Sequence, residues 1–430
     1  ERPKRLARRY SQTSFGLPFL ISLASTQTTT PGTYSLTVRA EAVSSDYPDA
    51  TADLVIRQVV NPPVPLGFDG GTSVVSGHLI ATWRFFEVTV PAGVTGWDVR
   101  LKNITGGTPS MIVRRDAPPN STAGNWSSPE SNPTWPSGNS WAGGLDWTGR
   151  TYEIYVPPYP QVGGRVVMGM GRPLEPGTYY VGVYNSHASV AADYTLESRG
   201  IGTGQTITVA NLNFTAGSNA TIANLAPREA AYFKVTIPAN TPSWEFTLAP
   251  SAGEMMMAMR RGTVPDFSAP GSSPGDGVQY NAGAGGNREI EMQKTGPERY
   301  LVLPRNDENF VLAGDYYIAV VSEGVGPVNT STIGTGTSSG VLTSLGTVAT
   351  PNLGAASLVG INQAVSLLGG QVKTYQFTVP AGSAGLELRL DNRVGNPVMS
   401  LISGSRLPQP GITSPNAIVT VVGGLSLIHI

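Results

Sequence analysis

The sequence contains no cysteine, little charge and almost no histidine. Its 430 residues include 0 cysteines and 3 histidines, and charged residues make up 13% of the chain, against about 25% in an average globular protein. Without cysteine, disulfides, thiolate metal sites and a thiol nucleophile are excluded, and cysteine use cannot report the redox compartment. The net charge of −1 offers no basic excess for nucleic acid or for an anionic membrane.

Long apolar runs are also missing. No stretch reaches the roughly 18 apolar residues of a membrane-spanning helix, so we predict no membrane insertion in this sequence. Both ends have unusual sequences: Arg2–Arg9 is a basic cluster without helical pattern, and Leu425–Ile430 resembles read-through of a sequencing adapter. We therefore expect a fragment of a larger metagenomic protein, with residues 425–430 artefactual.

The residues that are present indicate β-structure throughout. Segments such as Tyr34–Arg39, Phe86–Val90 and Tyr375–Val379 alternate apolar and polar side chains, which is the period of a half-buried strand. The 52 glycines and 35 prolines cluster between such segments as turn signals. The pattern predicts sandwiches or barrels, and the length predicts about three domains.

The strongest signal is an internal repeat. The strand Phe86–Pro91 recurs as Phe233–Pro238 and again as Tyr375–Pro380, at near-equal spacing. A large apolar residue that opens a new alternating strand follows each copy six residues after its proline: Trp97, Trp244 and Leu386. Proline lacks a backbone donor, so it is expected at the end of each first strand.

Two further segments repeat in the same order. Met111–Arg115 matches Met257–Arg261, and Gly177–Val183 matches Gly314–Val320. The third copy contains a candidate for the first match near Val398 and none for the second. Self-similarity at a long fixed period is the signature of tandem modules.

These repeats resemble the bacterial pre-peptidase C-terminal domain, a small β-sandwich. The family has a strand ending in Pro-Ala-Gly, a strand ending in Arg-Arg-Gly-x-x-Pro and a late Gly-x-Tyr-Tyr-Val strand. Met257–Pro265 fits the middle piece, whereas Asp116 replaces its glycine in the first copy. The resemblance implies an all-β chain of tandem antiparallel β-sandwich modules, jelly-roll-like or Ig-like.

The first sixty residues differ from the repeats. Thr30–Arg39 and Ala50–Ile56 look like the last two strands of a bacterial immunoglobulin-like domain, and Asn61–Pro65 like a stiff linker. Four parts are thus predicted: an Ig-like remnant at 1–60, module one at 64–204, module two at 205–345, and a truncated module three at 346–430.

We find no catalytic constellation and predict that this fragment is not an enzyme. His78 and His187 are interpreted as turn or surface residues, and His429 lies in the suspect tail. Two Gly-x-Ser-x-Gly matches, at 271–275 and 336–340, fall in loops without the strand and helix of a nucleophile elbow. No metal ligands are assigned. Calcium stays open as the one cofactor, although the acidic groups lack EF-hand spacing: Asp46 with Asp49, Asp146 with Glu153, and Asp307 with Glu308.

One candidate binding segment lies in the long insertion of module one. Five aromatic residues in polar, glycine-rich surroundings form it: Trp126, Trp135, Trp141, Trp147 and Tyr152. Two interpretations remain open. The rings pack the insertion onto the sandwich, or they are exposed and stack on sugar rings or anchor a protein.

The function we favour is non-catalytic: structural, adhesive or substrate-binding modules of a large bacterial protein, secreted or at the cell surface. This location is implied by the family resemblance. One alternative is an accessory role beside a secreted peptidase or other hydrolase whose catalytic domain lies outside the fragment. Another is glycan binding through the tryptophan-rich segment. The expected partners are an extracellular polysaccharide or a protein substrate.

Overall fold

The fold was analysed in a computed structural model, which describes residues 62–119, 140–142, 164–170, 173–227, 229–265, 277–281, 289–293, 295–304, 308–326, 334–408, 419–421 and 427–429. These residues form strands and turns and no helix, which confirms the all-β sandwich prediction. The chain divides into two compact units, Glu1–Arg57 and Gln58–Ile430, and every described residue belongs to the second.

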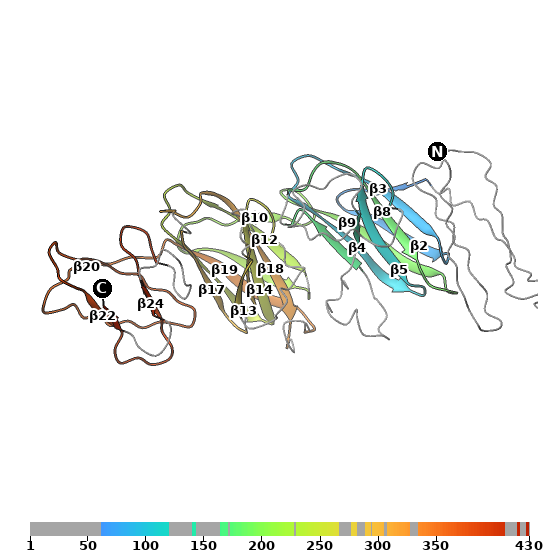
Figure 1. Ribbon diagram of the computed structural model, residues 1–430. Helices are drawn as coiled ribbons and strands as arrows, with labels where there is room; N and C mark the ends of the chain where they lie inside the picture. Colours follow the sequence, from blue (N-terminus) through green and yellow to red (C-terminus); the bar gives the residue numbers. More distant parts are fainter. Residues whose placement is uncertain are drawn as a thin grey trace, which may run out of the picture. The chain divides into compact units, whose positions relative to one another are not determined.

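Module one consists of two facing sheets (Figure 1). The first sheet has the order β1 (Val64–Pro65), β3 (Trp83–Val90), β8 (Gly177–Asn185), β5 (Pro109–Arg115), β6 (Ser140–Ala142). The second has the order β2 (Gly71–His78), β9 (Ala192–Ile201), β4 (Gly96–Thr105), β7 (Gly164–Met168). All of these pairings are antiparallel except that of β1 with β3.

Module two repeats this topology. One sheet has the order β10 (Val209–Asn211), β12 (Ala230–Ile237), β18 (Gly314–Gly324), β14 (Glu254–Arg261), β16 (Glu289–Gln293), β15 (Gly277–Asn281). The other has the order β11 (Ser218–Leu225), β19 (Ser338–Gly346), β13 (Trp244–Ala252), β17 (Glu298–Val302). Its first strand again pairs in parallel, β10 with β12, so the sequence repeat is a repeat of strand order.

Each module has its own core around one tryptophan. Trp97 is fully buried in module one, and its indole N–H donates to Ser198 Oγ (2.8 Å). The serine hydroxyl then donates to the carbonyl of Phe68 (2.7 Å). The same two bonds, at 3.0 and 2.7 Å, recur in the core of module two between Trp244, Ser344 and Phe214. In both modules the tryptophan therefore connects its own strand, through the serine on the neighbouring strand, to the segment that precedes the edge strand.

The paired arginines of the repeat hold the start of the late strand. Arg115 Nη2 donates to the carbonyl just before β8 (3.2 Å), and Arg261 Nη2 donates to the carbonyl just before β18 (2.7 Å). The next residue has a left-handed backbone in both modules: Gly262 at φ 85° and Asp116 at φ 65°. Aspartate tolerates this region better than most residues, which explains how module one keeps the turn without the family's glycine.

Module three is built differently. Its strands are short and form three two-stranded sheets: β20 (Asn352–Ala355) with β21 (Gln376–Thr378), β22 (Glu387–Arg389) with β25 (Leu427–His429), and β23 (Met399–Leu401) with β24 (Val419–Val421). In the other modules β2 and β11 pair with the last strands, β9 and β19. Among its described residues, module three has no strand that corresponds to β2 or β11. Several of its apolar side chains are exposed, including Leu358, Val359 and Leu368.

Candidate functional site

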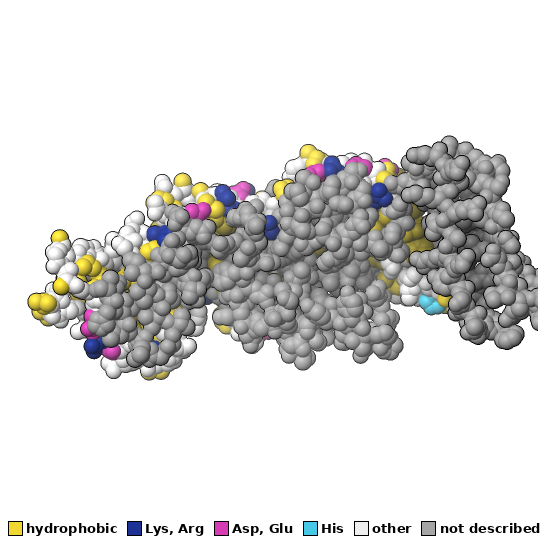
Figure 2. Space-filling view, viewed as in Figure 1, with side chains coloured by type: hydrophobic (Ala, Val, Ile, Leu, Met, Phe, Trp, Pro, Cys, Tyr) yellow, Lys and Arg dark blue, Asp and Glu magenta, His cyan; other side chains and the backbone are white. Residues whose placement is uncertain are grey.

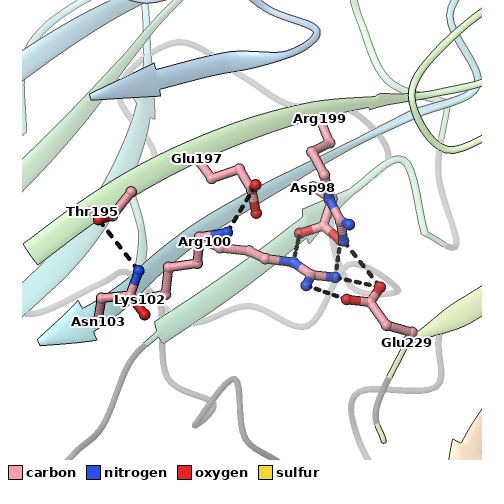
Figure 3. A network of polar contacts seen from close by, with 8 residues as sticks. All are labelled: Asp98, Arg100, Lys102, Asn103, Thr195, Glu197, Arg199 and Glu229. Carbon is pink, nitrogen blue, oxygen red and sulfur yellow. Dashed lines mark hydrogen bonds and ion pairs between the residues drawn. The ribbon is translucent and has the colours of Figure 1, made fainter. Parts of the chain in front are cut away.

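The junction between modules one and two holds a buried ionic network (Figure 3). Asp98 and Arg100 lie on β4 and Arg199 on the neighbouring β9, where Asp98 is paired with Arg199. Because side chains alternate along a strand, Asp98 and Arg100 point to the opposite face from the core residues between them. Glu229, just before β12 of module two, completes the network.

Arg100 is the centre of this network. Its guanidinium donates to both oxygens of Asp98, from Nε to Oδ1 and from Nη2 to Oδ2, each at 2.9 Å. It also donates to both oxygens of Glu229, from Nη1 at 2.6 Å and from Nη2 at 2.9 Å. Arg199 Nη2 lies 3.0 Å from Asp98 Oδ2 and 3.1 Å from Glu229 Oε2. Planar, bidentate contacts of this kind fix orientation as well as distance.

The described side chains of the network carry equal numbers of positive and negative charges, and most of their surface is buried. The side chains of Asp98 and Arg100 are fully buried, whereas Arg199 and Glu229 keep 16% and 20% of their side-chain exposure. Burial lowers the pKa of the Arg199 guanidinium, but the adjacent carboxylates of Asp98 and Glu229 outweigh burial, and the net pKa is raised. Among the described residues, two cations face two anions here, and removing one of them would leave an uncompensated buried charge.

A hydrophobic cluster lies beside the ionic network. Module one contributes Val167, Met170 and Ile201, and β10 contributes Val209. Module two contributes Val264, just after β14, and the outer face of its larger sheet: Ala230, Tyr232, Met256, Ala319 and Val321. Backbones meet here as well, because Met170 and Val264 form a parallel β-bridge. The junction is therefore packed like a domain interior rather than a wetted contact.

The linker between the modules is fastened to module one. The Asp69 carboxylate accepts N–H bonds from Gly200 (2.8 Å) and Thr206 (3.0 Å), on either side of the turn. Burial raises the pKa of Asp69, but the hydrogen bonds from Thr206 and Gly200 outweigh burial and lower it overall. A Cβ at Gly200 would lie 2.4 Å from Gln205 Oε1 and 2.7 Å from the Phe68 ring, so a larger residue there would have to displace these side chains.

This arrangement joins the two modules through ion pairs and apolar contacts. The guanidinium groups of Arg100 and Arg199 both bind carboxylates of the network, so neither is positioned to bind an anionic ligand. Among the described residues, no group of three or more histidine, aspartate or glutamate side chains is placed to hold a metal ion. The calcium expectation stays untested at Asp46, Asp49, Asp146, Glu153 and Asp307, which lie outside the described residues.

The predicted binding segment is described at one position. Trp141 lies on β6, the edge strand next to β5, where it is paired with Val113. Trp126, Trp135, Trp147 and Tyr152 lie outside the described residues. The choice between a packed insertion and an exposed aromatic surface therefore stays a prediction.

The interpretation of His78 as a turn or surface residue is wrong, because His78 ends β2 and is buried at 5% exposure. His78 Nδ1 lies 3.0 Å from the Tyr194 hydroxyl, and His78 Nε2 lies 3.1 Å from the carbonyl of Thr82. The match at 336–340 was expected in a loop, but its central Ser338 is the first residue of β19, is buried and donates to the carbonyl of Glu254 (2.8 Å). The match at 271–275 lies outside the described residues.

The junction residues were not anticipated from the sequence. The one available signal was Asp98 and Arg100 on the polar side of an alternating strand, in a chain with little charge. That signal indicates a solvated sheet face as readily as an interface. Glu229 lies 129 positions from Arg100 and belongs to no recognisable motif.

No helix in the described part of the chain is long and apolar enough to cross a membrane. No protein-family model matches the chain, and the search of curated proteins also gives no match. The predicted pre-peptidase C-terminal domains therefore remain a resemblance. One similar solved structure is the CUB1-EGF-CUB2 domain of human MASP-1/3, with a TM-score of 0.16 and 9% sequence identity. The match covers 64% of this chain and 98% of that one, and at this TM-score it carries no argument about function.

Proposed function

We propose that this chain is a non-catalytic spacer of a secreted or cell-surface protein, in which modules one and two act as one rigid body. The observation that carries the proposal is the buried junction, where Arg100 binds carboxylates from both modules. A flexible string of modules would have wet, weakly packed contacts between its parts. A rigid spacer instead fixes the distance between whatever lies before and after it.

Electrostatics support this interpretation. An exposed ion pair contributes about 0–1 kcal/mol, whereas breaking a buried pair by removing one partner costs about 3–5 kcal/mol. Among the described residues, Glu229 is the one member of the network from module two. Its loss would leave Arg100 and Arg199 facing the single carboxylate of Asp98, with the main polar contact between the modules gone.

The proposal is tested by measuring the distance between the modules. Because the chain has no cysteine, Thr89→Cys and Thr221→Cys introduce one spin label on each module, at exposed positions. Double electron–electron resonance should give a narrow distance distribution for this pair. Adding Glu229→Ala should broaden it clearly, while the circular dichroism of the strands is retained.

A neighbouring ion pair provides the matched control. Lys102 and Glu197 lie on the same two strands, 2.8 Å apart, with 24% and 21% of their side chains exposed. Figure 3 shows this pair beside the network, within module one. Lys102→Ala should leave the distribution narrow. A broad distribution in the parent protein, or no change with Glu229→Ala, would refute the rigid-body proposal.

Glycan binding is a second candidate, favoured by the place of Trp141 on the edge strand β6. Affinity electrophoresis in soluble polysaccharides tests it. If the segment binds sugar, the polysaccharide should slow the migration of the Trp141→Ala protein less than that of the Trp97→Phe control. Trp97 is buried in the core. Equal mobility of all variants in every polysaccharide would exclude the sugars used. An accessory role beside a hydrolase is the remaining proposal, and a catalytic domain in the same polypeptide would support it.

A further inference from the structure

Three loops meet at one end of module one around a buried asparagine. The loops comprise residues 76–82, 105–108 and 185–192, called here the loop cluster. Asn185 is fully buried, and its Nδ2 donates to the carbonyls of His78 (3.0 Å) and Val190 (3.1 Å). Its Oδ1 accepts the N–H groups of Thr108 (3.1 Å) and His187 (3.2 Å). One side chain therefore ties all three loops together.

His78 is held in the loop cluster as a neutral ring. Its side chain is buried, at 5% exposure. The Thr82 carbonyl can only accept, so Nε2 carries the hydrogen and donates to it at 3.1 Å. Nδ1 is then the acceptor for the Tyr194 hydroxyl at 3.0 Å. Both ring nitrogens are satisfied in this tautomer, and a second proton on Nδ1 would remove the acceptor of a buried hydroxyl.

His187 is held through the same kind of acceptor. Its Nδ1 accepts the backbone N–H groups of Ser189 (3.0 Å) and Val190 (2.9 Å), which closes the turn between β8 and β9. A proton on Nδ1 would break both bonds. The two histidines of module one therefore fix adjacent loops as hydrogen-bond acceptors, the role that protonation takes away.

The charges around His78 also oppose protonation. Burial and the positive charge of Arg84 on β3 lower the pKa of His78, against a raising contribution from the Thr82 carbonyl. Tyr194 on β9 faces the ring, and its own pKa is raised by burial, so it stays a neutral donor. The nearby Asp193 carboxylate on β9 accepts the N–H of Gly77 (2.6 Å). In the described part of the chain, no carboxylate is hydrogen-bonded to either imidazole.

We propose that the loop cluster is an acid-sensitive element, which opens when His78 and His187 are protonated and lose their acceptor nitrogens. Module two has serine at the position of Asn185, namely Ser322, and no histidine. The corresponding loops of module two therefore lack both the asparagine and the histidine acceptors. Acidification would loosen one end of module one while the matching end of module two stays closed.

Hydrogen-exchange mass spectrometry tests this at pH 7.5 and 5.5, corrected for the intrinsic dependence of exchange on pH. Peptides covering the loop cluster should exchange about tenfold faster at the lower pH, the factor expected for the loss of a buried hydrogen bond. Peptides covering residues 222–240 of module two are the internal control and should not change. Equal protection of the loop cluster at both pH values would overturn the proposal.

Variants separate histidine protonation from general acid effects. His187→Asn keeps a short oxygen acceptor for the turn, and His78→Gln keeps one donor and one acceptor, yet neither can gain a proton. In the double variant the loop cluster should stay protected at pH 5.5. Acid opening that persists in this variant would contradict the proposal.

A direct titration covers the case in which His78→Gln fails to fold. The chain has only 3 histidines, so their ring protons can be followed individually by NMR in the parent protein. His78 should titrate below the ordinary histidine value of about 6.5, together with the amide signals of residues 79–82. A ring that titrates without those amides moving would overturn the proposal, as would a ring still neutral at pH 5.

Discussion

At the scale of single residues, the two complete modules are stabilised by the same few contacts. Each core tryptophan donates its indole N–H to a buried serine, and the serine donates to a backbone carbonyl across the sheet. A buried tryptophan N–H usually has a hydrogen-bond partner, because leaving it unpaired costs free energy. The sequence repeat therefore keeps the serine as well as the more obvious aromatic residue.

The first prediction removes the serine in module two. Ser344→Ala leaves the buried Trp244 N–H without its partner, and we expect a loss of about 1–3 kcal/mol in the free energy of unfolding. Urea denaturation followed by tryptophan fluorescence measures it. Ser76→Ala, at an exposed position of module one, is the control and should change stability by less than about 0.5 kcal/mol. Equal effects of the two variants would contradict this role for Ser344.

The second prediction concerns the left-handed turn after the arginine pair. Gly262 has φ 85°, and a Cβ there would meet nothing within 4 Å, so a substitution costs backbone strain alone. Gly262→Ala should destabilise by about 1–2 kcal/mol, whereas Gly262→Asn should cost less because asparagine tolerates this region. Thermal unfolding of the two variants compares them. Gly262→Asn unfolding as early as Gly262→Ala would rule out the strain explanation.

Residues with local signals could be predicted, and those with distant partners could not. Strand alternation predicted that Trp97 and Trp244 each open a half-buried strand, because a period of two is visible within five positions. The same alternation placed Asp98 and Arg100 on the other face without showing what covers that face. The partner Glu229 lies on another module, so its role depends on docking and not on any local pattern.

At the scale of elements, β14 differs from an ordinary sandwich strand because both of its faces are buried. Met255, Met257 and Met259 point into the core of module two. Met256 points the other way and packs in the junction cluster. Methionine adapts to irregular spaces, and this strand contacts two different interiors.

The third prediction addresses the linker turn fastened by Asp69. A carboxylate whose pKa is lowered on folding stabilises the fold above its ordinary value of about 3.8 and loses this contribution as pH falls through the lowered value. Asp69→Asn should therefore reduce stability at pH 7 and flatten the fall in stability below pH 4. Thermal unfolding between pH 7 and pH 3 tests this, and an unchanged acid profile in Asp69→Asn would refute it. The side chain is partly solvated, so the expected change is small.

Module three matches the other modules in sequence more closely than in structure. Residues 360–367 correspond to β11 by position, yet they form no strand. The sequence pattern could predict that a third repeat exists, because its first strand and turn match the others. An alternating sequence pattern is not sufficient to form a sheet, because a two-stranded sheet without a packed face is only marginally stable.

At the scale of the whole molecule, the junction makes unfolding of modules one and two a shared event. The junction cluster has members from both modules, and the ionic network is complete only while they are docked. Opening one module would therefore expose apolar surface and unpaired charge on the other. We expect the two modules to unfold together, although each has a core of its own.

The fourth prediction is that a single buried charge at the junction separates modules one and two. Val167 on β7 is 8% exposed and packs in the junction cluster. Val167→Asp buries an unpaired carboxylate there and should undock the modules. Hydrogen exchange at increasing urea then compares peptides from β4 and β13, which should share one midpoint in the parent protein and show two midpoints in Val167→Asp. The same change at Val74, which is 77% exposed on β2, should keep the midpoints together. Two midpoints in the parent protein would mean that the modules are neighbours without being coupled, and the rigid spacer would lose its physical basis.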